Sequence, residues 1–119
     1  MPNVKNINTV IAAIQAEQIA YFQMMDWLRE CPRETNACGT AACIGGFTDL
    51  VMKPGLKKSE GGGIMNVCNF LGINKETGDA LFFAENSIVE LYEITKSMAI
   101  AALTDLRDGM GFKDWYDYT

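Results

Sequence analysis

Two stretches of apolar residues at helical spacing, one near each end of the chain, constrain the fold most. The members of the first stretch are Ile7, Val10, Ile11, Ile14, Tyr21, Phe22, Met25 and Leu28. This spacing places the apolar side chains on one face of a helix. Cys31-Pro32 ends the helix, because a residue before proline disfavours the helical conformation. The sequence therefore predicts a long helix over 7–30, with Asn6 or Asn8 as its N-cap.

The second stretch predicts another long helix, which begins at Ser87 and ends at Gly109. Ser87 followed by Glu90 has the pattern of a capping box. The apolar residues at helical spacing are Ile88, Leu91, Tyr92, Met98, Ala99, Ala102, Leu103 and Leu106. Residues 98–103 are apolar on every side, so we expect this helix at the centre of the molecule.

Three shorter helices are predicted between the long ones, over 40–52, 64–71 and 75–83. Thr40 and Asn74 are expected N-caps, and Gly72 is an expected C-terminal cap. No alternating strand pattern of useful length occurs. Because 119 residues suit one hydrophobic core, we predict an all-α, compact single-domain bundle of about five helices over 1–111, followed by a tail over 112–119.

The pair Gly45-Gly46 lies in the middle of the predicted helix over 40–52. Each glycine costs about 1 kcal/mol relative to alanine inside a helix. A compensating contact is therefore expected, most simply a second helix that packs closely against the pair.

The chain contains no histidine. This excludes Ser-His-Asp and Cys-His relays and sites that need a histidine ligand for zinc or haem. Glu85, Glu90 and Glu93 remain as acid or base candidates, but they are equally typical of an exposed helix face. The composition therefore favours a protein that is not an enzyme and has no cofactor.

The densest local motif is Cys38-Gly39-Thr40-Ala41-Ala42-Cys43 followed by Ile44-Gly45-Gly46. With Thr40 as N-cap, Cys38 and Cys43 lie near the positive end of a helix dipole, which favours thiolate. A thiol redox pair or half of a metal site is one interpretation. Buried structural thiols are favoured, because free cysteine packs as a small apolar residue and no C-x2-C spacing occurs.

This motif carries a resemblance. CGTAACIGG, with Phe22, Met25 and Trp27 before it and LGINKETGDALFF after it, resembles a loose family of short phage and bacterial proteins. Their pattern is CGTxxCxAG, then LGLxxxxAxxLF, then a long helix, and the likeness covers most of 20–108. This chain departs from it at Gly45 and Gly78. The resemblance implies an all-helical fold and a phage origin, with no established activity.

A basic, glycine-rich segment over 53–63 is the second candidate site. Its residues are Lys53, Lys57, Lys58, Gly61, Gly62 and Gly63, and a predicted helix follows them. Lysines beside the N–H groups of a helix N-terminus can hold an anion or a nucleotide. The segment is not a P-loop, because no G-K-[ST] follows the glycines. A solvated surface loop is the favoured interpretation.

The third candidate is the tail, which concentrates aromatic residues among aspartates. Its aromatic residues are Phe112, Trp115, Tyr116 and Tyr118. Such residues supply much of the energy of protein interfaces, so Trp115, Tyr116 and Tyr118 are candidates for partner contact. The alternative is a tail that folds back on its own domain, which is favoured for Phe112 and Trp115.

The net charge of the chain limits the classes of partner that it is expected to bind. The chain carries a net charge of −5, with net charges of −2 over 1–52, +3 over 53–75 and −6 over 76–119. An acidic chain repels nucleic acid. No signal peptide or membrane span is predicted, so a cytoplasmic protein is expected.

These observations favour a small acidic protein that acts by protein–protein contact or self-association, and the resemblance implies a phage-encoded inhibitor of a host defence system. A binder of small anions at 53–63 and a thiol or metal protein remain the alternatives.

Overall fold

The computed structural model describes residues 2–18, 20–25, 27–29, 41–54, 63–85 and 87–119. Within these ranges the α-helices are α1 (Val4–Ala16), α2 (Ile44–Met52), α3 (Ile64–Leu71), α4 (Lys75–Phe83) and α5 (Lys96–Arg107). In the same described ranges, the 3-10 helices η2 (Leu91–Glu93) and η3 (Trp115–Tyr118) follow α4 and α5 respectively. The predicted all-α fold of about five helices is confirmed.

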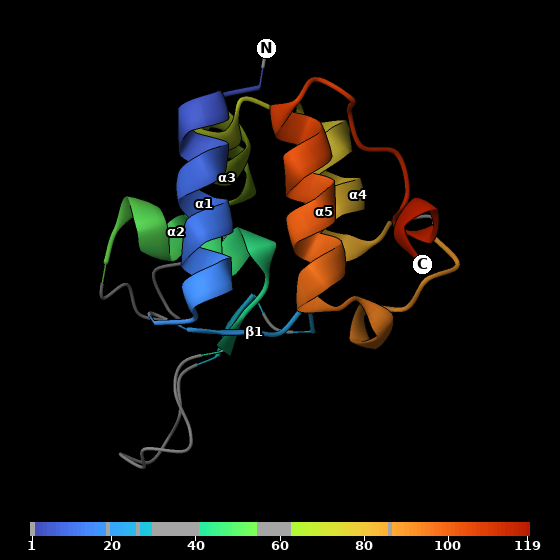
Figure 1. Cartoon of the computed structure of the whole chain (residues 1–119), viewed down its shortest axis with the longest axis horizontal. Coiled ribbons are helices and arrows are strands. Elements are labelled where there is room, and N and C mark those ends of the chain that lie inside the picture. Colours follow the sequence, from blue (N-terminus) through green and yellow to red (C-terminus); the bar gives the residue numbers. More distant parts are fainter. Residues whose placement is uncertain (1, 19, 26, 30–40, 55–62, 86) are drawn as a thin grey trace.

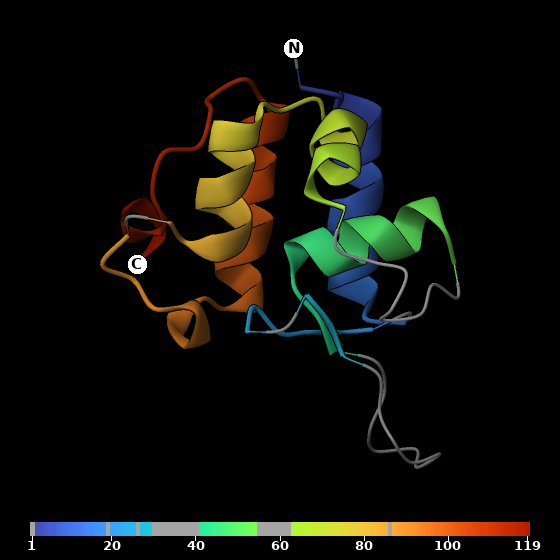
Figure 2. The same ribbon diagram turned by 180° about the vertical axis from the view of Figure 1, so that it is seen from behind.

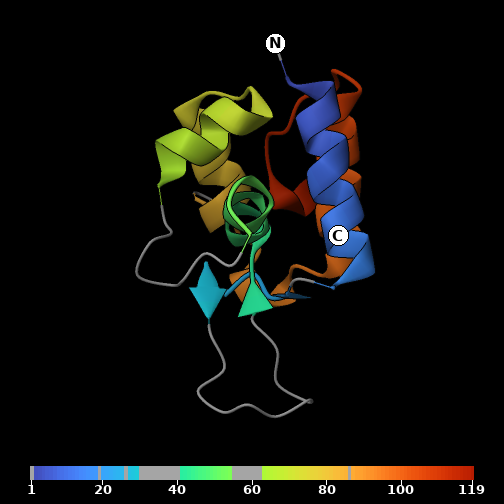
Figure 3. The ribbon, with the colours of Figure 1, turned by 90° about the vertical axis from the view of Figure 1, so that its left-hand side faces the viewer.

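The helices form two layers around one core. Helices α1 and α5 lie side by side in the first layer (Figure 1), and α3 and α4 lie behind them (Figure 2). Seen from the side, α2 lies between these layers (Figure 3). The largest fully buried side chains are Trp115, Phe47, Phe82, Ile7, Ile14, Ile44, Leu71, Leu81, Leu103, Val10, Val67 and Thr48.

The first helix is much shorter than predicted. Asn3, not Asn6 or Asn8, is the N-cap of α1, and its side chain accepts the N–H of Asn6 at 3.0 Å. The helix ends at Glu17, which adopts a left-handed conformation with φ 48°. The predicted continuation to residue 30 is wrong, because the apolar spacing has a gap between Ile14 and Tyr21.

A small sheet occupies part of that predicted helix. Strands β1 (Tyr21–Phe22) and β2 (Leu28–Arg29) flank β3 (Ala41–Ala42), with β1 parallel and β2 antiparallel to β3. Strands of two residues are too short to produce an alternating pattern in the sequence. Their pairing depends on contacts between distant segments, so no local pattern predicts it.

Two of the short helices form as predicted. Helix α3 spans Ile64–Leu71 and ends at Gly72, whose φ is 74°. Helix α4 spans Lys75–Phe83, and its N-cap Asn74 accepts the N–H of Thr77 at 2.7 Å. Both boundaries depend on caps adjacent in the sequence.

The last helix begins later than predicted. Its N-cap is Thr95, which accepts the N–H of Met98 at 3.2 Å, so the predicted helix start at Ser87 is wrong. Gly109 follows its end, as predicted, with φ 81°. The helix is not surrounded on all sides, because Ala101 is exposed while Ala102 and Leu103 are buried.

Candidate functional site

The cysteine motif is only partly within the described ranges, which exclude Cys38, Gly39 and Thr40. The predicted helix start at Thr40 is wrong, because β3 precedes α2 and Cys43 is the N-cap. Burial raises the pKa of the Cys43 thiol from 9.0 to about 11, against smaller lowering effects from backbone hydrogen bonds to Gly46 and Gly45. At Cys43 desolvation therefore outweighs the effect of the helix N-terminus and favours the neutral thiol.

The compensating contact for Gly45 and Gly46 is Trp27, rather than the predicted second helix. A Cβ at Gly45 would overlap the indole ring of Trp27, and one at Gly46 would overlap the Trp27 backbone oxygen. A Cβ at Gly46 would also lie 2.9 Å from the Cβ of Ala42. The glycine pair therefore lets a non-helical segment of the chain lie against α2.

Trp27 joins α2 to α4. Its indole N–H donates to Oδ2 of Asp49 at 2.6 Å. Its ring packs edge-on against Phe82 at a centroid distance of 5.4 Å and is stacked on Phe83 at 5.8 Å. The motif CIGG thus has a structural role, since it forms the surface that receives Trp27.

The described residues give little support to a metal or anion site. Within the described ranges, no group of three or more Cys, Asp or Glu side chains is arranged to hold a metal ion. Of the basic segment, Lys57, Lys58, Gly61 and Gly62 lie outside those ranges. Lys53 is the C-cap residue of α2 and Gly63 the N-cap residue of α3. The structure therefore describes only two of the six predicted anion-binding residues, and the anion site stays a prediction.

The tail folds back onto the domain. Trp115 is fully buried, and its indole N–H donates to the backbone oxygen of Leu81 at 3.1 Å. Phe112 is also buried and packs edge-on against Trp115 at a centroid distance of 5.0 Å. The fold-back alternative holds for both residues, and the prediction of partner contact through Trp115 is wrong because its side chain is inside the core.

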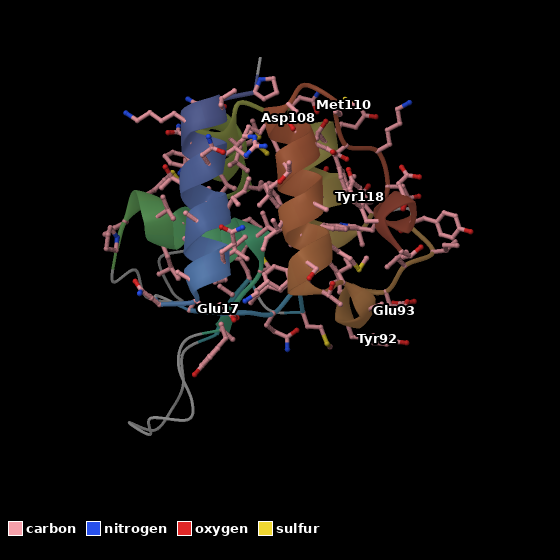
Figure 4. The ribbon with its side chains drawn as sticks, viewed as in Figure 1. Glu17, Tyr92, Glu93, Asp108, Met110 and Tyr118 are labelled. Atoms are coloured by element: carbon pink, nitrogen blue, oxygen red, sulfur yellow. The ribbon has the colours of Figure 1, made fainter. Side chains whose placement is uncertain are left out.

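The two tyrosines of the tail, Tyr116 and Tyr118, differ in how far their side chains are exposed. Tyr118 is partly buried, stacks on Phe112 at 5.8 Å and donates its hydroxyl to Oδ2 of Asp105 at 2.7 Å. Its ring and hydroxyl therefore make contacts within the domain (Figure 4), and its assignment as a partner contact stays a prediction. Tyr116 is 58% exposed and remains a candidate.

The most exposed apolar side chains of the described residues include a pair that the sequence placed in a helix. Ile88 is 78% exposed and Tyr92 is 71% exposed, and both lie between α4 and α5. Their neighbours Val89 and Ile94 are buried, so the backbone of this connection is packed against the core. Leu91, Ile94 and Met98 keep helical spacing through this segment, so the apolar periodicity does not reveal the break.

Local hydrogen bonds fix the shape of this connection. The N–H of Ser87 donates to the backbone oxygen of Ala84 at 3.0 Å, which reverses the chain after α4. The Ser87 hydroxyl donates to Oδ1 of Asp114 at 2.6 Å, so the tail holds the turn. In η2, the carboxylate of Glu93 accepts the N–H of Glu90 at 2.9 Å. Ile88 and Tyr92 are therefore exposed on an ordered segment.

We use the term α4–α5 surface for the exposed residues Phe83, Glu85, Ile88, Glu90, Tyr92 and Glu93. Figure 4 shows Tyr92 and Glu93 on η2 at one end of α5, with Asp108 and Met110 at the other end. The surface is acidic as well as apolar. Residues 76–95 contain five carboxylates and no Lys or Arg.

A hollow of about 230 Å³ lies beside this surface, between α4 and the tail. Its lining residues are Glu76, Asp79, Ala80, Glu85, Lys113 and Asp114. Asp79 pairs with Lys75 at 2.8 Å, and Asp114 accepts hydrogen bonds from Ser87 and Tyr116. These bonds to the Ser87 hydroxyl and the Tyr116 N–H hold the pKa of Asp114 below its ordinary value.

Comparison of the chain with known proteins found no match: no family model, curated protein or solved structure matches it. None of the described helices has the length and apolar character needed to cross a membrane.

Proposed function

We propose that this chain acts without catalysis by binding a protein partner, and that the α4–α5 surface is its binding surface. The observation that carries the proposal is the exposure of Ile88 and Tyr92 on an ordered, tail-supported connection. Large apolar side chains at the centre of an interface supply most of its binding energy, and tyrosine is enriched among them.

The alternatives receive less support from the described residues. A thiol redox protein needs a reactive thiolate, whereas Cys43 is buried and its pKa is raised to about 11. The anion binder at 53–63 stays an alternative, because most of its residues lie outside the described ranges. The resemblance to short phage and bacterial proteins makes inhibition of a bacterial host protein the form of binding that we propose.

The test is capture of a partner from a bacterial lysate by tagged wild-type protein and by Ile88→Ala and Tyr92→Ala variants. Met110→Ala is the matched control, because Met110 is 76% exposed and lies at the other end of α5 (Figure 4). We expect the wild type and Met110→Ala to capture one protein in stoichiometric amount. Ile88→Ala and Tyr92→Ala should fail to capture it.

Two results would overturn the proposal. One is capture of the same partner, at the same yield, by wild type, Ile88→Ala and Tyr92→Ala. The other is recovery of a tightly retained small molecule and no protein. All variants must first show the thermal unfolding of the wild type, since exposed side chains should be removable without loss of stability.

A further inference from the structure

We infer that the segment bound by the α4–α5 surface is a basic, amphipathic stretch of another protein, in which apolar side chains alternate with Lys or Arg. This inference rests on the proposed function and specifies the partner's chemistry. It follows from the way in which apolar and acidic side chains are combined on one ordered connection.

Ile88 and Tyr92 form the apolar part of the α4–α5 surface. Ile88 and Tyr92 are exposed while Val89 and Ile94, on the same connection, are buried. Phe83 is 47% exposed at the end of α4, and its ring is stacked on Trp27. Large side chains held by buried neighbours present apolar area at low entropic cost, so an apolar partner residue is the chemistry they fit.

The segment that contains the α4–α5 surface is negatively charged. Five carboxylates and no basic residue occur between Lys75 and Lys96. Among the residues that the structure describes, Glu76, Glu85 and Glu90 are exposed and make no ion pair within the chain. Lys113 lines the same hollow as Glu76 and Glu85, and Lys75 interacts electrostatically with Glu85, so carboxylates outnumber these two cations. An excess of carboxylates beside exposed apolar side chains favours a partner of opposite charge and repels an acidic one.

The negative charge of the surface disfavours nucleic acid, anionic lipid and a second copy of the chain as its occupant. Nucleic acid and an anionic lipid surface carry phosphate, which the carboxylates repel. A second copy of the chain would bring an equally acidic α4–α5 surface if the two surfaces met around a twofold axis. A basic segment of a different protein satisfies both the apolar and the charged parts of the surface.

The probes for the test are synthetic peptides titrated into the full-length protein while its backbone amide NMR signals are recorded. One peptide alternates leucine and lysine, a second replaces lysine with glutamate, and a third replaces leucine with glycine. We expect the leucine–lysine peptide to bind and to shift the amide signals of Ile88 to Tyr92, with little change at Met110. The other two peptides should bind at least about tenfold more weakly, because each lacks one of the two contacts.

Variants separate the roles of the side chains. Tyr92→Ala should weaken the leucine–lysine peptide about fivefold or more. The double variant Glu85→Gln/Glu90→Gln should weaken it about threefold at low salt and show less salt dependence. Asp108→Asn is the control for charge, because Asp108 lies at the far end of α5 (Figure 4), and it should leave binding unchanged.

The outcomes distinguish this inference from the proposed function. If the captured partner needs Tyr92 but its binding is unaffected by salt and by Glu85→Gln/Glu90→Gln, the basic-segment inference is overturned and the proposed function stands. Amide shifts spread equally over Asp108, Met110 and Ile88 would show nonspecific attraction to an acidic protein and would also overturn the inference. Concentration-dependent dimerisation that displaces the peptide would identify a second copy as the occupant instead.

Discussion

Trp27 and the glycine pair of α2 illustrate how a sequence motif can be structural. Gly45 would place a Cβ into the Trp27 side chain, whereas Gly46 would place one into the Trp27 backbone oxygen. In an unobstructed helix, alanine would stabilise by about 1 kcal/mol at either position. The two glycines are therefore kept by a close approach, for two distinguishable reasons.

We predict that Gly45→Ala and Gly46→Ala each lower the free energy of unfolding by about 2 kcal/mol or more, measured by urea denaturation. In a Trp27→Ala background, which removes the ring but keeps the backbone oxygen, Gly45→Ala should cost almost nothing. Gly46→Ala should remain costly in that background. Equal rescue of both variants would contradict the assigned contacts.

The buried Cys43 thiol predicts a loss of stability at alkaline pH. Its pKa is raised from 9.0 to about 11 by burial, so the folded state favours the neutral thiol. The stabilisation is complete below pH 9 and is lost as the pH rises toward 11, on the order of 2 kcal/mol. Urea denaturation of the wild type and of Cys43→Ala at pH 8 and pH 10 should show a smaller pH dependence in the variant. Identical pH dependence would contradict it.

At the scale of elements, caps that lie next to a helix in sequence were predictable and distant contacts were not. Asn74 and Gly72 set the ends of α4 and α3 through neighbouring backbone groups. The end of α1 is different, because the Glu17 carboxylate accepts the N–H of Phe22 and pairs with Lys96 at 2.9 Å. A contact across 79 positions in the sequence leaves no local pattern.

The same distinction applies to the candidate sites. The fold-back of Phe112 and Trp115 was among the interpretations that the sequence allowed, since a cluster of aromatic residues favours burial. The α4–α5 surface was missed, because Ile88 and Tyr92 also fit a helical spacing with Leu91 and Met98. Periodicity cannot distinguish a continuous helix from a turn that preserves its spacing for a few residues.

The tail is predicted to be an integral part of the domain. Trp115→Ala should lower the free energy of unfolding by about 3 to 5 kcal/mol, because it removes a fully buried ring. Tyr116→Ala, at a 58% exposed neighbour, should change it by less than about 0.5 kcal/mol. Chemical denaturation followed by circular dichroism measures both, and equal stability of the two variants would contradict the buried position of Trp115.

At the scale of the whole molecule, charge is distributed unevenly along the chain. The net charge over 76–119 is −6, while that over 53–75 is +3. The acidic part includes α4, η2 and the tail, and the tail supports the connection that exposes Tyr92. A surface that combines carboxylates with exposed apolar side chains is complementary to a basic partner.

The most direct test of this account is the dissociation constant for the captured partner, measured by titration calorimetry with wild type, Tyr92→Ala and Met110→Ala. We expect Tyr92→Ala to raise the Kd about tenfold and Met110→Ala to leave it within about twofold of the wild type. Equal Kd values for wild type and Tyr92→Ala would contradict the assignment of the α4–α5 surface as the binding site.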